Sequence, residues 1–167
     1  MQKELPEEFD QQIRALKKEG DNFQMGHKNL KAVEKYKEAI TLLSEPIEEW
    51  TYIRILWRCI AENYWLNAQF NEGRKGGYIE ALEYWKKIMR LPHSVGSSTY
   101  HFRIGQIRYE LGQFDKAKDE LMRAYLSDGM DAFKYDDKKY FELIRPIIEE
   151  KEDKSTYSNS SDTYRID

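Results

Sequence analysis

The chain has little of what usually interrupts helices or crosslinks a fold. Its 167 residues include nine glycines, four prolines and one cysteine. So few breaks favour long helices over many short strands, and a single cysteine excludes an intramolecular disulfide. The sequence has no apolar run of about 18 residues, the length that spans a membrane, and no N-terminal apolar run typical of a signal peptide. We therefore expect a cytoplasmic protein with no membrane partner.

The chain has no large excess of positive or negative charge, and it lacks the usual catalytic sequence patterns. Charged residues make up 34% of the chain, yet the net charge is only -3, whereas nucleic-acid-binding proteins are usually strongly basic. The three histidines, His27, His93 and His101, lack ligand spacing such as i, i+4. The stretch 73–77 lacks the preceding strand and the Gly-Lys-Ser/Thr ending of a phosphate-binding loop. We expect no nucleic acid, no metal and no cofactor, and no enzymatic activity.

Apolar residues at helical spacing are abundant, and they predict seven helical segments. These segments cover residues 7–26, 28–43, 47–70, 78–91, 97 or 98 to 111, 115–126 and 136–150. Residues 71–77 are polar and glycine-rich, which predicts a mobile loop. Residues 151–167 have almost nothing to bury and are predicted to be a disordered tail.

A short pattern occurs three times, each time after a glycine-bearing turn. An alanine is followed by a large apolar residue and then by another small or apolar one, in Ala32-Tyr36-Ala39, Ala81-Trp85-Ile88 and Ala117-Leu121-Ala124. Such a repeat predicts stacked helix pairs that expose a groove rather than enclose a catalytic pocket. Small residues on the first helix of each pair would let the two helices approach closely; they are Gly20, Ala61 and Gly105.

The helix pairs resemble tetratricopeptide repeats. The third pair matches that family best, with Ile104-Gly105, Tyr109, Gly112, Phe114, Ala117, Leu121 and Ala124. The resemblance covers residues 10–127 and implies an all-α superhelical stack of about three helix pairs plus a C-terminal capping helix. We expect one domain over residues 7–150. The family binds diverse proteins and peptides, so the resemblance also implies a protein-binding function.

In this family the first helix of each pair lines the concave face. Aligning the three pairs places ten candidate partner-binding residues there: Arg14, Lys17, Lys18, Arg58, Glu62, Trp65, Phe102, Arg103, Gln106 and Tyr109. Arginine and aromatic residues contribute much of the binding energy at interfaces, and the five basic residues favour an acidic partner segment. The alternative is that these are ordinary solvated helix faces, with Trp65 and Phe102 in the core.

One known binding mode of the family fits this sequence poorly. Members that bind chaperones clamp a C-terminal carboxylate with lysine, arginine and asparagine side chains. Lys17 and Arg103 match that clamp, but Asp21, Cys59 and Thr99 replace two asparagines and a lysine. Because Asp21 would repel a carboxylate, a co-chaperone function is disfavoured. Cys59 is either a thiol with a pKa lowered by neighbouring Arg58 or an unreactive residue of the groove or core.

The stretch from Ala124 to Glu142 carries a narrower resemblance. It is similar to bacterial repeat proteins whose genes lie beside polymorphic toxins, which implies an immunity protein that neutralises a toxin by binding an acidic segment of it. The alternative is a scaffold or adaptor subunit of a larger assembly. The sequence leaves open whether the concave or the convex face binds the partner.

Overall fold

The computed structural model describes residues 5–70 and 75–160, and within these ranges the chain is all-α, as predicted. No strand occurs among these residues. The α-helices are α1 (Glu7–Met25), α2 (Asn29–Ile40), α3 (Thr51–Phe70), α4 (Lys75–Met89), α5 (Ser98–Glu110), α6 (Phe114–Asp128) and α7 (Lys138–Ser160). Two short 3-10 helices, η1 (Ile47–Glu49) and η2 (Gly129–Phe133), precede α3 and α7.

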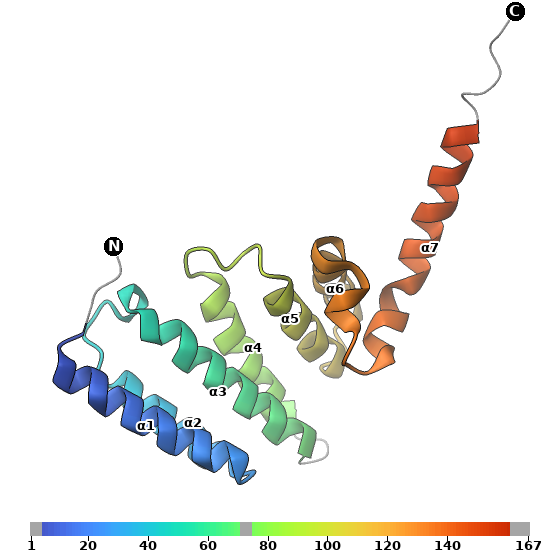
Figure 1. Cartoon of the computed structure of the whole chain (residues 1–167). Coiled ribbons are helices and arrows are strands. Elements are labelled where there is room, and N and C mark those ends of the chain that lie inside the picture. The colour runs from blue at the N-terminus through green and yellow to red at the C-terminus, as the bar shows by residue number, and fades with distance from the viewer. Residues whose placement is uncertain (1–4, 71–74, 161–167) are drawn as a thin grey trace, which may run out of the picture.

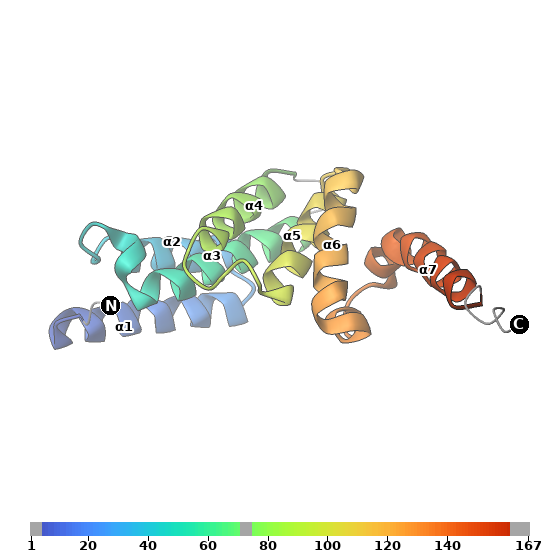
Figure 2. The same ribbon diagram turned by 90° about the horizontal axis from the view of Figure 1, so that it is seen from above.

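The helices form three antiparallel pairs that stack in chain order. Helix α1 pairs with α2, α3 with α4, and α5 with α6, while α7 continues from the end of the last pair (Figure 1). Seen from above, the pairs follow one another in a row (Figure 2). Each helix packs mainly against the helices next to it in the sequence. This is the stack of helix pairs that the repeat predicts.

Small residues let the paired helices approach closely, as expected. A Cβ atom added to Gly20 would lie 2.5 Å from the ring of Tyr36, and one added to Gly105 would lie 2.7 Å from Cγ of Leu121. Both distances are shorter than van der Waals contact. The partners of these glycines, Tyr36 and Leu121, are fully buried, so the first and third pairs are each joined by a large side chain that fits over a glycine.

The core runs along the stack, and α3 contributes most to it. Its buried residues are Ile53, Leu56, Trp57, Ile60, Ala61, Asn63, Trp65 and Ala68. Helices α2 and α4 both pack against α3, so this helix is covered over much of its circumference. Burial of one large apolar side chain contributes about 1.5–3 kcal/mol, which makes α3 the central element of the fold.

Several predicted boundaries differ from the structure. The predicted helix 28–43 ends at Ile40, and the predicted helix 47–70 is divided into η1 and α3, which begins at Thr51. Helix α4 begins at Lys75 rather than at residue 78, because Gly77 packs against α3, where its added Cβ would lie 2.7 Å from the carbonyl oxygen of Tyr64. Within the predicted loop 71–77, residues 71–74 lie outside the described residues. Helix α7 continues to Ser160, so the predicted tail 151–167 overlaps this helix, and its residues 161–167 also lie outside the described ranges.

None of the helices in the described ranges is long and apolar enough to cross a lipid bilayer.

Candidate partner-binding surface

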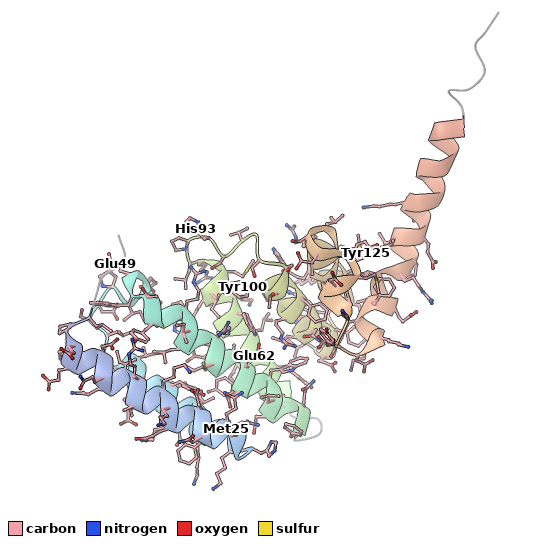
Figure 3. The ribbon with its side chains drawn as sticks, in the orientation of Figure 1. Met25, Glu49, Glu62, His93, Tyr100 and Tyr125 are labelled. Atoms are coloured by element: carbon pink, nitrogen blue, oxygen red, sulfur yellow. The ribbon has the colours of Figure 1, made fainter. Side chains whose placement is uncertain are left out.

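The first helices of the three pairs, α1, α3 and α5, are connected by side-chain contacts along one face. Asn63 of α3 donates from Nδ2 to Oε1 of Gln24 on α1, at 3.2 Å. Arg103 of α5 lies with Nε 3.2 Å from Oε1 of Glu62 on α3. Glu62, labelled in Figure 3, lies midway along α3. These two contacts join α1 to α3 and α3 to α5.

Most of the predicted basic residues on this face are already paired with carboxylates. Arg14 lies 2.6 Å from Asp10, and Lys17 lies 2.7 Å from Asp21. Arg103 contacts Asp136 at 3.6 Å in addition to Glu62. Positive and negative charges therefore alternate along the face, and the basic bias predicted from the sequence is largely neutralised within the protein.

Lys18 and Arg58 are the predicted basic residues that stay unpaired. Both side chains are exposed, and neither forms an ion pair within the described part of the chain. Arg58 influences the pKa of Cys59 together with Lys17, and it influences the pKa of Glu62 together with Arg103. Arg58 thus differs from Lys17 and Arg103, each of which forms an ion pair with a carboxylate.

Glu62 is the acidic centre of this surface. Burial raises the pKa of its carboxyl group above the usual 4.5, and the nearby guanidinium groups of Arg103 and Arg58 oppose that shift. Burial disfavours the charged form of a carboxylic acid, so Glu62 is a carboxylate held partly out of water by the helices around it. Its charge depends on Arg103 for compensation.

Three of the ten candidates are buried rather than displayed in the groove. Trp65 and Phe102 are each 5% exposed and Gln106 is 1% exposed. The ring of Trp65 packs 5.2 Å from that of Tyr78, and the ring of Phe102 packs 5.0 Å from that of Phe133. The alternative that places Trp65 and Phe102 in the core is therefore right, and a partner could reach these side chains only after the helices moved.

Residues 129–160, which contain η2 and α7 and are called the C-terminal cap, contact α5 at its end of the predicted groove. Gln106 donates from Nε2 to Oδ1 of Asp136 at 2.8 Å, and the Tyr140 hydroxyl donates to Oε1 of Glu110 at 2.8 Å. The rings of Tyr109 and Tyr140 meet edge to face, 5.3 Å apart. The part of the face that remains accessible therefore lies mainly on α1 and α3, with Arg103 at its edge.

Sequence reasoning missed Asp136 and Tyr140 as neighbours of this surface. It assigned residues 136–150 to a capping helix and did not predict where that helix docks. The contacts from Asp136 to Gln106 and from Tyr140 to Glu110 each join residues thirty positions apart. Nothing in the local pattern signals such a pairing, because helical periodicity identifies a face and not its partner.

Cys59 does not match the reactive alternative. Burial raises the pKa of its thiol, and this effect outweighs the opposing influence of Lys17 and Arg58. A raised pKa keeps the thiol protonated and weakly nucleophilic at neutral pH. The description of Cys59 as an unreactive residue of the packed surface is the better one.

A cleft of about 730 Å³ lies outside the predicted groove. It is lined by residues of η1, the start of α3 and the segment 91–93, including Trp50, Arg54, Ile55, Pro92 and His93. Glu49 and His93, which are labelled in Figure 3, also line it. None of the ten candidate residues lines this cleft. No group of three His, Cys, Asp or Glu side chains suited to a metal ion occurs in the ranges that the structure describes.

Comparisons with known proteins support the fold. No family model matches the sequence, and no curated protein matches it. The structure is similar to the C-terminal TPR-containing domain of a Plasmodium falciparum protein named for FK506 binding, with a TM-score of 0.56 and 16% sequence identity. The match covers 90% of this chain and 95% of that chain. At this identity the similarity concerns the fold alone, and this chain has a tetratricopeptide-like fold of three stacked helix pairs and a C-terminal helix.

Proposed function

We propose that this protein is a non-enzymatic interaction module that binds a segment of another protein along the concave face formed by α1, α3 and α5. Stacked helix pairs form extended surfaces of the kind that bind protein segments. The proposal rests on the exposure of Arg58, which lies one helical turn before Glu62 on α3 and has no ion pair in the described ranges. A guanidinium in this position has its donors free for a partner.

The chemistry of this face favours an acidic group in the partner, placed opposite Arg58. Lys17 and Arg103 are already paired with Asp21 and Glu62, so a partner carboxylate gains most by binding Arg58, with which it can form two parallel hydrogen bonds. The alternating charges on either side favour a segment with both acidic and basic residues. Charge matching of this kind contributes to specificity and to the rate of association.

Arg58→Glu tests the proposal. The partner is first identified by pull-down with the tagged protein, and its dissociation constant is then measured by calorimetry. We expect Arg58→Glu to weaken binding about tenfold or more, since interface arginines often contribute about 2 kcal/mol. Helicity and melting temperature should not change, because Arg58 is exposed.

Lys116→Glu is the matched control, because Lys116 is exposed on α6 and forms no ion pair in the described ranges. Arg103→Glu should also weaken binding, although it removes the contacts with Glu62 and Asp136 as well. Normal binding by both arginine variants would show that the concave face is not used. If the protein turned over a substrate, and mutation of a single residue abolished that turnover, the proposal that it is not an enzyme would be wrong.

The immunity role is the narrower form of this proposal. The stretch 124–142 that carries the resemblance forms the end of α6, η2 and the start of α7, with Phe133 and Tyr140 buried. Because these residues pack the C-terminal cap, their structural role alone accounts for the sequence pattern, and no toxin partner is needed to explain it. Co-expression with a toxin encoded next to this gene, in the bacterial cytoplasm, should restore growth if the role is immunity. Recovery of the chain only within a stable assembly would favour the scaffold or adaptor alternative.

A further inference from the structure

Two lysines and two tyrosines from α2, α3 and α4 meet where α3 packs against the second helices of the first two pairs. The rings of Tyr64 on α3 and Tyr84 on α4 stack with their centroids 6.1 Å apart. Lys37 of α2 donates from Nζ to the Tyr64 hydroxyl at 2.9 Å, and Nζ of Lys87 on α4 lies 4.7 Å from the Tyr84 centroid. We call Lys37, Tyr64, Tyr84 and Lys87 the tyrosine–lysine cradle.

The two ammonium groups of the cradle are held by aromatic rings instead of carboxylates. Lys37 also lies over the Tyr64 ring, 5.3 Å from its centroid, and Lys87 lies 5.7 Å from the Trp57 ring. Neither lysine forms an ion pair within the ranges that the structure describes. Their neighbours differ in this respect, since Lys35 lies 3.0 Å from Glu38 and Lys86 lies 2.7 Å from Glu83.

Both lysines keep hydrogen-bonding capacity for a ligand. An ammonium group has three donors, and Lys37 uses one of them on Tyr64 while Lys87 forms no hydrogen bond in the described structure. The hydrogen bond to Tyr64 and the nearby Glu80 raise the pKa of Lys37, so this side chain stays charged. The contacts with the tyrosine rings restrict both lysines, which lowers the entropy lost when they bind an anion.

The cradle lies apart from the concave face. Three of its members, Lys37, Tyr84 and Lys87, belong to α2 and α4, the second helices of their pairs, and none of the ten concave-face candidates belongs to the cradle. Tyr64 and Tyr84 are half-buried, so their rings are fixed while their edges reach the surface. Tyrosine is one of the residue types that contribute most at protein interfaces, because it adds contact area with few rotatable bonds.

We propose that the tyrosine–lysine cradle is a second binding surface, on the convex side of the stack, for an acidic segment of a partner protein. Two carboxylates of that segment pair with Lys37 and Lys87, and its chain lies over the stacked rings of Tyr64 and Tyr84. Charge complementarity supports this assignment, because two cations that form no ion pair in the described ranges flank an aromatic surface. A ligand with spaced carboxylates satisfies both at once.

The test uses a fluorescein-labelled peptide of alternating glutamate and serine, titrated with the full chain and followed by fluorescence anisotropy. We expect Lys37→Glu/Lys87→Glu to weaken binding about tenfold relative to Lys28→Glu/Lys116→Glu, which makes the same charge change at exposed lysines elsewhere. Lys37→Gln/Lys87→Gln, which removes charge without adding repulsion, should give a smaller loss in the same direction. Circular dichroism checks that each variant is folded.

The concave face is also proposed to bind acidic groups, so Arg58→Glu is used to separate the two surfaces: the amide NMR shifts that the peptide causes at α2 and α4 should persist in this variant. Amide NMR spectra recorded during the titration should show shifts at α2 and α4. Shifts confined to α1, α3 and α5, or a loss of binding in Arg58→Glu alone, would assign the peptide to the concave face and overturn the proposal. Equal binding by the cradle and control variants would overturn it as well, as would displacement of the peptide by inorganic phosphate at similar concentrations.

Discussion

At the scale of single residues, Gly20 shows how tightly the paired helices fit. An alanine there would place its Cβ 2.5 Å from the ring of Tyr36, a rigid group that is buried and hydrogen-bonded to Asp21. Overpacking a core costs about 1–3 kcal/mol, whereas alanine gains about 1 kcal/mol over glycine in helix propensity. We expect Gly20→Ala to lower the free energy of unfolding by about 1 kcal/mol in urea titrations.

Gly96 provides the matched control for that substitution, since no atom lies within 4 Å of its added Cβ. Gly96→Ala should therefore leave the free energy of unfolding nearly unchanged. Equal stability of Gly20→Ala and the unmodified protein would mean that Tyr36 shifts easily, and the close approach of α1 and α2 would then not be a constraint on the sequence.

Glu62 makes stability depend on pH in a defined direction. Because its pKa is raised in the folded protein, the folded state binds a proton more tightly than the unfolded chain. The stability that Glu62 contributes is then largest below about pH 4.5 and is lost as the pH rises through the raised pKa. Glutamine resembles the protonated acid and can still accept a hydrogen bond from Arg103.

We therefore expect Glu62→Gln to be at least as stable as the unmodified protein at neutral pH, with a higher melting temperature. The difference should shrink as the pH is lowered through the pKa of Glu62. Thermal melts across a pH series measure this directly. A melting temperature that falls at neutral pH in the variant would show that the ion pair with Arg103 outweighs the cost of burying the charge.

The sequence identified the residues of the packed core better than the residues of the surface. Gly20, Gly105, Tyr36 and Leu121 take the positions expected from the repeat. Phe102 and Gln106 were expected to line the groove but are buried, because α4, α6 and the cap all pack against α5. Apolar and polar side chains of α5 are therefore buried around most of its circumference. A periodic pattern cannot separate groove from core when nearly every face is covered.

At the scale of elements, Tyr140 anchors α7 to the third helix pair. It is 2% exposed, it donates a hydrogen bond to Glu110, and its ring contacts Phe102 and Tyr109. Truncation of a buried aromatic side chain costs about 3–5 kcal/mol. We expect Tyr140→Ala to lower the free energy of unfolding by about that amount and to speed hydrogen exchange at the amides of α5.

Tyr140→Phe separates the hydrogen bond from the packing. It keeps the ring and should cost only about 1–2 kcal/mol, since it leaves the carboxylate of Glu110 without this donor. Glu110 keeps its contact with Lys139 at 2.7 Å, which limits the loss. A phenylalanine variant as unstable as the alanine variant would show that the hydrogen bond, and not the ring, holds the cap in place.

The helical segments were predictable from the sequence, because the local spacing of apolar residues indicates a helix. The first and last residues of the helices were less predictable. All seven predicted segments are helical in the structure. The early start of α4 depends on a contact between Gly77 and α3, which no local signal reveals. The extension of α7 to Ser160 covers a polar stretch that apolar periodicity does not identify as a helix.

At the scale of the whole molecule, stability is expected to be highest in the middle of the stack. Helix α3 packs against α2 and α4 and is bridged by side chains to α1 and α5, whereas α1 and α7 lie at the ends. In repeat proteins the terminal elements have fewer neighbours and open first. Native-state hydrogen exchange should show the slowest amides in α3, and slower exchange in α1 or α7 would contradict this order.

The packing of each helix mainly against its sequence neighbours also has a mechanical consequence. In residues 5–70 and 75–160, no hydrogen bond or ion pair joins the first helix pair to the third, and the second pair packs against both. The curvature of the stack therefore depends on two interfaces. A small rotation at each interface adds up to a larger displacement at the ends. A bound partner can therefore change the curvature of the stack, and a force applied to the two ends of the stack would change its affinity for that partner.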